Sequence, residues 1–118
     1  MIDLNTKQIV EKYPIAFATI SQDFRPNVIA VLYAKVISDN QIIITDNFMA
    51  TTKDNILKNK NVCLAVWNEK EEGYKITGEA QYYDHGDYLK YVKEMPENEG
   101  LPAKGAIVVT ISNIHKLG

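Results

Sequence analysis

The chain has 118 residues, of which 46% are hydrophobic, and thirteen basic residues nearly balance fifteen acidic ones for a formal net charge of −2. This length fits a single domain spanning residues 1–118, which can bury a hydrophobic core without needing disulfide bonds. The balanced charge argues against a nucleic-acid partner, which calls for a basic face. The sequence has no signal-peptide pattern and no apolar run near the ~20 residues of a membrane span. We therefore expect a cytoplasmic protein with no membrane partner.

The first half of the chain predicts one helix and three strands. Asn5 followed by Gln8 resembles a capping box that begins the helix, and Pro14 ends it. Alternating or continuous apolar residues then predict strands, the first two joined by a hairpin turn. The second of these strands is apolar on both sides, so both of its faces should be covered. The three predicted strands cover residues 15–21, 27–38 and 41–45.

The second half predicts two more helices, over residues 51–59 and 87–95, and three more strands. Those strands cover residues 62–67, 74–83 and 106–114. Gly78 in the middle of a strand indicates a bend, a bulge or a close backbone approach. Hairpin connections make the sheet mainly antiparallel, and a sheet of this size tends to close on itself. The predicted fold is mainly β with short helices, built as a six-stranded antiparallel barrel.

No catalytic motif stands out. His85 and His115 form no pattern with each other or with the single cysteine, Cys63, at a metal-ligand spacing. The sequence contains neither a glycine-rich phosphate loop nor a nucleophile elbow. We assign no catalytic residue and no metal site, and we expect Cys63 to be a buried core thiol.

One segment, residues 45–55, could hold an anion. A loop leads into the start of a helix, where Thr51, Thr52 and Lys53 supply two hydroxyls and an ammonium beside free backbone N–H groups. Thr51 and Asp54 also fit a plain capping box, worth about 1 kcal/mol to the helix. From this segment alone the capping interpretation is favoured, and Asp46 and Asp54 would repel a phosphate unless they point away.

Four stretches together resemble the FMN-binding split-barrel family related to pyridoxamine phosphate oxidase, and above all its small single-domain members. In order and spacing they cover nearly the whole chain. They comprise residues 17–21 with 25–31, residues 50–56 with 59–62, residues 74–80, and residues 106–111. The chain is much shorter than the oxidase itself. Its one arginine, Arg25, leaves no basic cluster for a substrate phosphate, which argues against vitamin B6 oxidation.

The resemblance implies a six-stranded split barrel that binds FMN non-covalently at a homodimer interface. It implies that the strand over residues 27–38 contacts the flavin ring and that residues 45–53 hold the ring edge, the ribityl chain and the phosphate. It also implies that the loop over residues 101–104 approaches the flavin of the other subunit. The cofactor-binding residues it assigns are Ala30, Val31, Thr45, Asp46, Met49, Thr51, Thr52 and Lys53.

An FMN protein of this kind would be an oxidoreductase or an electron carrier, supplied by a nicotinamide or a protein electron donor. Because the flavin carries the redox chemistry, missing acid–base motifs do not count against it. Three alternatives stay open: a non-catalytic protein that stores or senses FMN, a split barrel that binds haem or a deazaflavin, and an oligonucleotide-binding barrel. The last would need a basic face studded with aromatic side chains, and the charge for it is missing.

Overall fold

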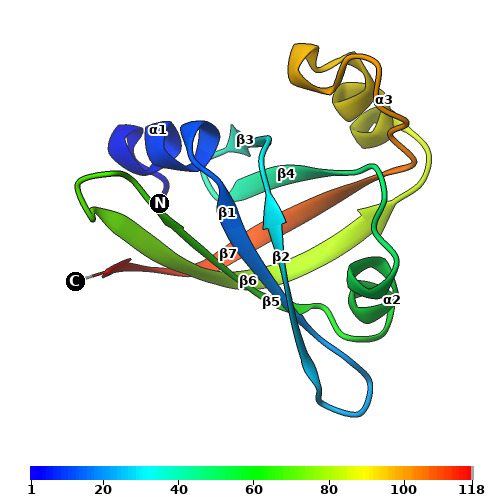
Figure 1. Cartoon of the computed structure of the whole chain (residues 1–118), viewed down its shortest axis with the longest axis horizontal. Helices are drawn as coiled ribbons and strands as arrows, with labels where there is room; N and C mark the ends of the chain where they lie inside the picture. The colour runs from blue at the N-terminus through cyan, green and yellow to red at the C-terminus, as the bar shows by residue number, and fades with distance from the viewer. Residues whose placement is uncertain (118) are drawn as a thin grey trace.

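The computed structural model describes residues 1–117, which form one coiled antiparallel sheet with helices at its ends (Figure 1). The strand order is β2-β1-β5-β6-β7-β4-β3. The elements in chain order are α1 (Leu4–Lys12), β1 (Ile15–Ile20), β2 (Pro26–Val31), β3 (Ala34–Ser38), β4 (Gln41–Asp46), α2 (Thr51–Lys58), β5 (Asn61–Trp67), β6 (Gly73–Tyr83), α3 (Asp87–Glu94), the 3₁₀ turn η1 (Pro96–Asn98) and β7 (Gly105–Leu117).

The prediction of six strands is wrong, because residues 27–38 form two strands rather than one. β2 pairs with β1, whereas β3 pairs with β4 at the opposite edge of the sheet, and Leu32 and Tyr33 link the two. Apolar residues on both faces report burial but not the identity of the hydrogen-bonding partner. The result is a seven-stranded sheet whose two edge strands are neighbours in sequence but do not pair. This open, coiled sheet fits the split-barrel architecture.

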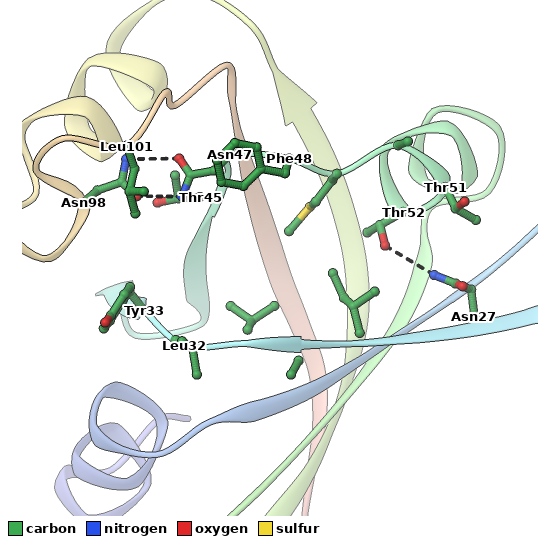
Figure 2. Close-up of a pocket in the computed structure, with 15 residues that line it drawn as sticks. Asn27, Leu32, Tyr33, Thr45, Asn47, Phe48, Thr51, Thr52, Asn98 and Leu101 are labelled. Carbon is green, nitrogen blue, oxygen red and sulfur yellow. Dashed lines mark hydrogen bonds between the residues drawn. The ribbon is translucent and has the colours of Figure 1, made fainter.

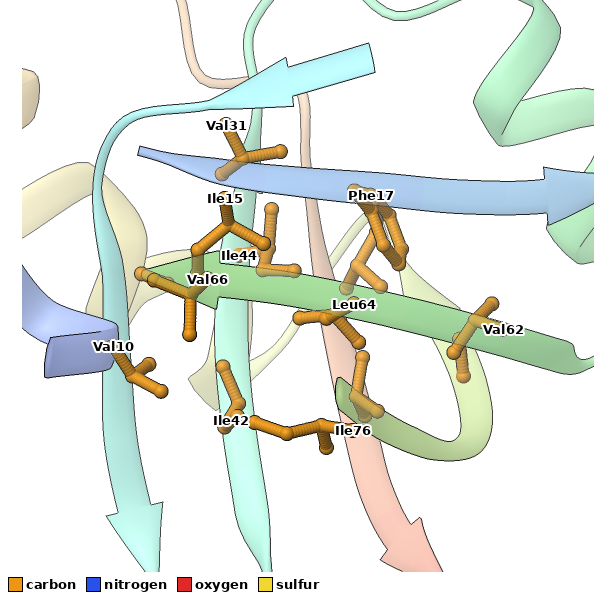
Figure 3. Packing of buried hydrophobic residues seen from close by; sticks show 14 of the residues in the cluster. Val10, Ile15, Phe17, Val31, Ile42, Ile44, Val62, Leu64, Val66 and Ile76 are labelled. Carbon is orange, nitrogen blue, oxygen red and sulfur yellow. The ribbon is translucent and has the colours of Figure 1, made fainter. Parts of the chain in front are cut away.

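The core lies inside the coil of the sheet (Figure 3). Alternation along β1 turns Ile15 and Phe17 inward, where they meet Leu64 of β5 and Ile76 of β6, and none of these side chains is more than 1% exposed. Val10 of α1 packs against the same cluster. A smaller cluster of buried apolar side chains lies beneath α3.

Two local features refine the sequence predictions. α1 begins at Leu4, capped by Asp3, whose Oδ1 accepts from the Thr6 N–H at 2.8 Å, so the capping box expected from Asn5 is wrong. The close approach predicted at Gly78 is confirmed: the β6–β7 register shifts there, and a Cβ on Gly78 would lie 2.2 Å from the Thr110 carbonyl oxygen.

No helix formed by residues 1–117 has the length and apolar character that crossing a membrane requires.

Candidate functional site

A cavity of about 530 Å³ occupies the gap between the edge strand β2 and the segment that runs from the end of β4 into α2 (Figure 2). Its volume falls within the roughly 300–1,000 Å³ typical of small-molecule sites. The 3₁₀ turn η1, through Asn98, and the loop after it, through Leu101, close one side of the cavity. The lining residues are Asn27, Ile29, Ala30, Val31, Leu32, Tyr33, Thr45, Asn47, Phe48, Met49, Ala50, Thr51, Thr52, Asn98 and Leu101.

One wall of the cavity is the edge strand β2. Three consecutive residues, Ile29, Ala30 and Val31, line it. Among the described strands β2 pairs only with β1, so the N–H and C=O groups on its outer side have no strand partner. This wall therefore combines small apolar side chains with unpaired backbone donors and acceptors, a combination that suits the edge of a planar heterocycle.

The other end of the cavity is the start of α2. Ala50 is the N-cap residue, and within the described part of the chain no side chain caps the helix, so the N–H groups of its first turn are open. Thr51 is exposed, whereas Thr52 is buried and its Oγ1 accepts from Asn27 Nδ2 at 3.4 Å. The capping interpretation of the Thr51 hydroxyl is wrong, because Thr51 lies one residue inside the helix and its side chain lines the cavity.

The two carboxylates that could repel an anion point elsewhere. Asp46 is fully buried and accepts from the Met49 N–H at 2.7 Å and from the Tyr82 hydroxyl at 2.6 Å. Burial, together with the hydrogen bond to Asp46, raises the pKa of Tyr82 far above its ordinary value. Asp54 forms an ion pair with Lys58 at 3.2 Å, one turn further along α2. Neither carboxylate lines the cavity.

Lys53, predicted as the phosphate anchor, does not line the cavity either. Its Nζ lies 4.9 Å from the centroid of the Tyr82 ring, in cation–π geometry. Within residues 1–117, no charged side chain lines the cavity. An anion bound at this end would be held first by backbone N–H groups and hydroxyls.

Six of the eight predicted cofactor residues thus line one cavity: Ala30, Val31, Thr45, Met49, Thr51 and Thr52. Asp46 and Lys53 lie behind it and contact Tyr82. These placements bring the predicted residues together, while contact with a ligand stays a prediction.

Sequence reasoning missed the far end of the cavity. Asn98 is buried and exchanges two hydrogen bonds with Asn47, at 2.8 and 3.2 Å, which fasten η1 to the loop after β4. No local sequence pattern could predict this pair of side-chain amides, since Asn47 and Asn98 lie far apart in the sequence. Leu101, expected near the flavin of another subunit, lines the cavity of its own chain.

Large apolar side chains surround this end of the cavity. Leu32, Tyr33, Phe48 and Leu101 line it and are all exposed, Phe48 by 75%. Exposed apolar side chains gathered around a cavity are typical of a surface that binds another molecule.

A second, apolar hollow of about 330 Å³ adjoins the first on the outer side of β1 and β2. Ile29 and Ala30 line both hollows, and Val28 and Trp67, which border the second, are more than half exposed. The β2 wall is thus open to solvent on the side away from the cavity as well.

Comparison with known proteins identifies relatives of this chain. It is 38% identical over 112 residues to the uncharacterized protein MJ0282 of Methanocaldococcus jannaschii, covering 92% of this chain and 75% of that protein. The crystal structure of tagged HupZ from Group A Streptococcus superimposes with a TM-score of 0.92 and 21% identity, covering 99% of this chain and 94% of the other.

A structure described as an FMN-binding protein from Syntrophomonas wolfei superimposes with a TM-score of 0.80 at 15% identity, covering 96% of this chain and 84% of the other. At such identities these structures show the shared fold. The family model named pyridoxamine 5'-phosphate oxidase matches residues 4–118, nearly the whole chain. The chain therefore belongs to the pyridoxamine 5'-phosphate oxidase family.

Proposed function

We propose that this chain binds FMN non-covalently in the cavity between β2 and α2 and acts as an oxidoreductase or electron carrier. One observation carries the proposal: a single cavity joins an apolar strand edge to an uncapped helix N-terminus. FMN has the matching shape, a planar ring at one end and a phosphate at the other. Family membership and the shared fold with an FMN-binding protein support it.

The residues present fit the ring. Ile29 and Val31 supply apolar contact, and Ala30 leaves the backbone of the strand accessible. The unpaired N–H and C=O groups of β2 can then bond to the polar edge of the ring. Met49 and Thr45 line the facing wall.

The residues present also fit the phosphate. Free N–H groups and the positive dipole end of α2 favour an anion, and the hydroxyls of Thr51 and Thr52 add donors. Lys53 in the same turn adds a positive charge nearby. With Asp46 and Asp54 engaged elsewhere, no carboxylate side chain of residues 1–117 lines this end of the cavity.

FMN when bound supplies the capacity to accept and pass on electrons. The residues of the chain would hold the ring against β2, anchor the phosphate at α2 and exclude water at the apolar end through Phe48 and Leu101. A nicotinamide or a protein would deliver the electrons.

The proposal includes a homodimer. The outer hollow along β1 and β2 presents exposed Val28 and Trp67 beside Ile29 and Ala30, which also line the cavity. A second copy covering this face would bury the apolar surface and close the open side of the ring site.

The first test is the visible spectrum of the purified protein before and after FMN is added and free ligand is removed. About one retained FMN per chain is expected, with riboflavin held more weakly because it lacks the phosphate. Failure to retain FMN would contradict the proposal, and retention of haem or of a deazaflavin instead would identify those alternatives. Reduction of bound FMN by NADH or NADPH separates a redox protein from one that stores FMN.

Lys53→Ala tests the phosphate end. Because Lys53 lies near the cavity without lining it, we expect the affinity for FMN to fall by about 0.2–1 kcal/mol, the range for a nearby, partly exposed opposite charge. Fluorescence titration with FMN and with riboflavin measures it, and riboflavin binding should stay unchanged. Lys58→Ala is the matched control, since Lys58 lies at the other end of α2. Equal losses for both ligands would show that Lys53 does not act on the phosphate.

A further inference from the structure

Among residues 1–117, Asp46 is the only charged residue that is fully buried. It lies at the end of β4 and does not line the cavity. Burying a carboxylate costs several kcal/mol unless other groups bond to it, so its partners define its role.

The partners of Asp46 hold the loop that forms a wall of the cavity. Oδ1 accepts from the Met49 N–H at 2.7 Å and lies 3.9 Å from Lys104 Nζ, while Oδ2 accepts from the Tyr82 hydroxyl at 2.6 Å. Lys104 also donates its ammonium to the Met49 carbonyl and its amide to the Asp46 carbonyl. Both backbone groups of Met49, which lines the cavity, are therefore fixed.

Gly105 makes the bond between Asp46 and Tyr82 possible. β7 lies between β4 and β6, and Gly105 is the residue of β7 that pairs with Asp46. To reach Asp46 from β6, the Tyr82 side chain crosses β7 at Gly105. A Cβ there would lie 2.0 Å from the Tyr82 hydroxyl oxygen. The missing side chain at Gly105 thus provides the path of the tyrosine.

We propose that Asp46, Tyr82 and Gly105 form a positioning unit that fixes residues 47–50 in the conformation that shapes the cavity and presents the start of α2 to the phosphate of a bound nucleotide. The second half of this inference rests on the proposed function. Asp46 and Tyr82 are positioning residues, because they act on a ligand only through Met49 and α2.

Two further observations support this unit. Burial and the bond to Asp46 raise the pKa of Tyr82, so its hydroxyl stays protonated as a donor. Lys53 of α2 lies over the Tyr82 ring. The same tyrosine thus contacts both the loop anchor and the helix whose N-terminus faces the cavity.

Tyr82→Phe tests the unit with the smallest change. Tyr83→Phe is the matched control, because Tyr83 is the next residue of β6 and its hydroxyl donates to Gln81 at the surface. Tyr82→Phe removes a hydrogen bond to a charged group. We therefore expect the backbone amide of Met49 to exchange its hydrogen for deuterium about tenfold faster, and FMN to bind about tenfold more weakly. The visible circular dichroism of bound FMN should also change, and Tyr83→Phe should match the wild type.

Substitution of Asp46 provides a graded series. Asp46→Asn keeps the shape and an acceptor for the Met49 N–H, so it should restore much of what Asp46→Ala loses. Recovery in the asparagine variant would show that the hydrogen bonds, and not the charge alone, position the loop.

The outcomes separate the two proposals. Wild-type protein that fails to retain FMN would contradict the proposed function, while Met49 exchange would still decide whether the unit fixes the loop. Equal Met49 exchange in Tyr82→Phe and Tyr83→Phe would overturn the positioning unit. Faster exchange with unchanged FMN affinity and spectrum would overturn its role in binding.

Discussion

The two long walls of the cavity are built in opposite ways. On the side of β4 and α2, Asp46 ties down Met49, two hydrogen bonds join Asn47 to Asn98, and buried Asn55 donates to Thr19 Oγ1 at 3.0 Å. On the side of β2, the strand is an edge with its outer backbone groups unpaired and apolar side chains exposed.

This contrast supports the proposal that one chain builds only half of the site. The first wall is fixed by bonds within the chain and should hold its shape without a ligand. On the second wall, the outer backbone groups of β2 have no strand partner and apolar side chains are exposed. A bound ring and a second copy of the chain would each cover part of this surface. A change on the open wall should therefore affect binding and association directly. A change on the fixed wall should affect stability, and should affect binding only through the shape of that wall.

Ala30→Glu on the open wall is expected to have the largest effect. It places a carboxylate on the exposed surface that the two hollows share, where a partner or a flavin ring would have to bury it. Light scattering at micromolar concentration should show a dimer for the wild type and a monomer for the variant, and the variant should fail to retain FMN. Far-ultraviolet circular dichroism should stay unchanged.

Thr110→Glu is the control for that change, since Thr110 is exposed on β7, away from both hollows. A wild-type chain that is monomeric under these conditions would contradict the homodimer. A dimeric Ala30→Glu variant would place the interface on another face.

Thr19→Val, which removes a hydrogen bond between α2 of the fixed wall and β1, is expected to have an intermediate effect. Valine keeps the shape of threonine but leaves the buried Asn55 amide without its partner, which should lower the free energy of unfolding by about 1–3 kcal/mol. Urea denaturation measures the change. Thr77→Val, at a half-buried position of β6, serves as the control and should stay near the wild type. An equally stable Thr19→Val variant would show that water replaces the bond.

The ionisation of Tyr82 is expected to have the smallest effect, and it reports on a single side chain of the fixed wall. Because its pKa is raised above the ordinary value of 10.0, the folded state holds this proton more tightly than the unfolded state does. Its contribution to stability is fully present below pH 10.0 and is lost as the pH rises through the folded pKa.

Phenolate absorbance checks this prediction. Between about pH 10 and the onset of alkaline unfolding, wild type and Tyr82→Phe should show equal phenolate absorbance per chain, because Tyr82 is not ionised. A wild-type signal larger than that of Tyr82→Phe by one tyrosine would contradict the raised pKa.

Local sequence patterns predicted most elements of the fold. They failed where the structure depends on pairing between segments that are far apart in the sequence. The alternation around Phe17 placed β1 correctly, and the central glycine of β6 correctly indicated a close approach. The break at Leu32 and Tyr33 was missed, because it arises only from strand pairing: the residues before it pair with β1, and those after it pair with β4.

The candidate site divides in the same way. The family resemblance led to residues that line the cavity, such as Ala30 and Thr51. It also included Asp46, whose side chain does not line the cavity, because it accepts a hydrogen bond from Tyr82 across an intervening strand. A pattern of neighbouring residues carries no information about a bond of that kind.

The position of β7 has a consequence for how the chain is made. Among the strands of residues 1–117, β7 comes last in sequence, yet it lies between β6 and β4 in the sheet. Before residues 105–117 leave the ribosome, the remaining strands can form only two separate pieces, β2-β1-β5-β6 and β4-β3. Completion of the sheet therefore awaits the synthesis of residues 105–117, and until then the inner edges of both pieces need protection from pairing with other chains.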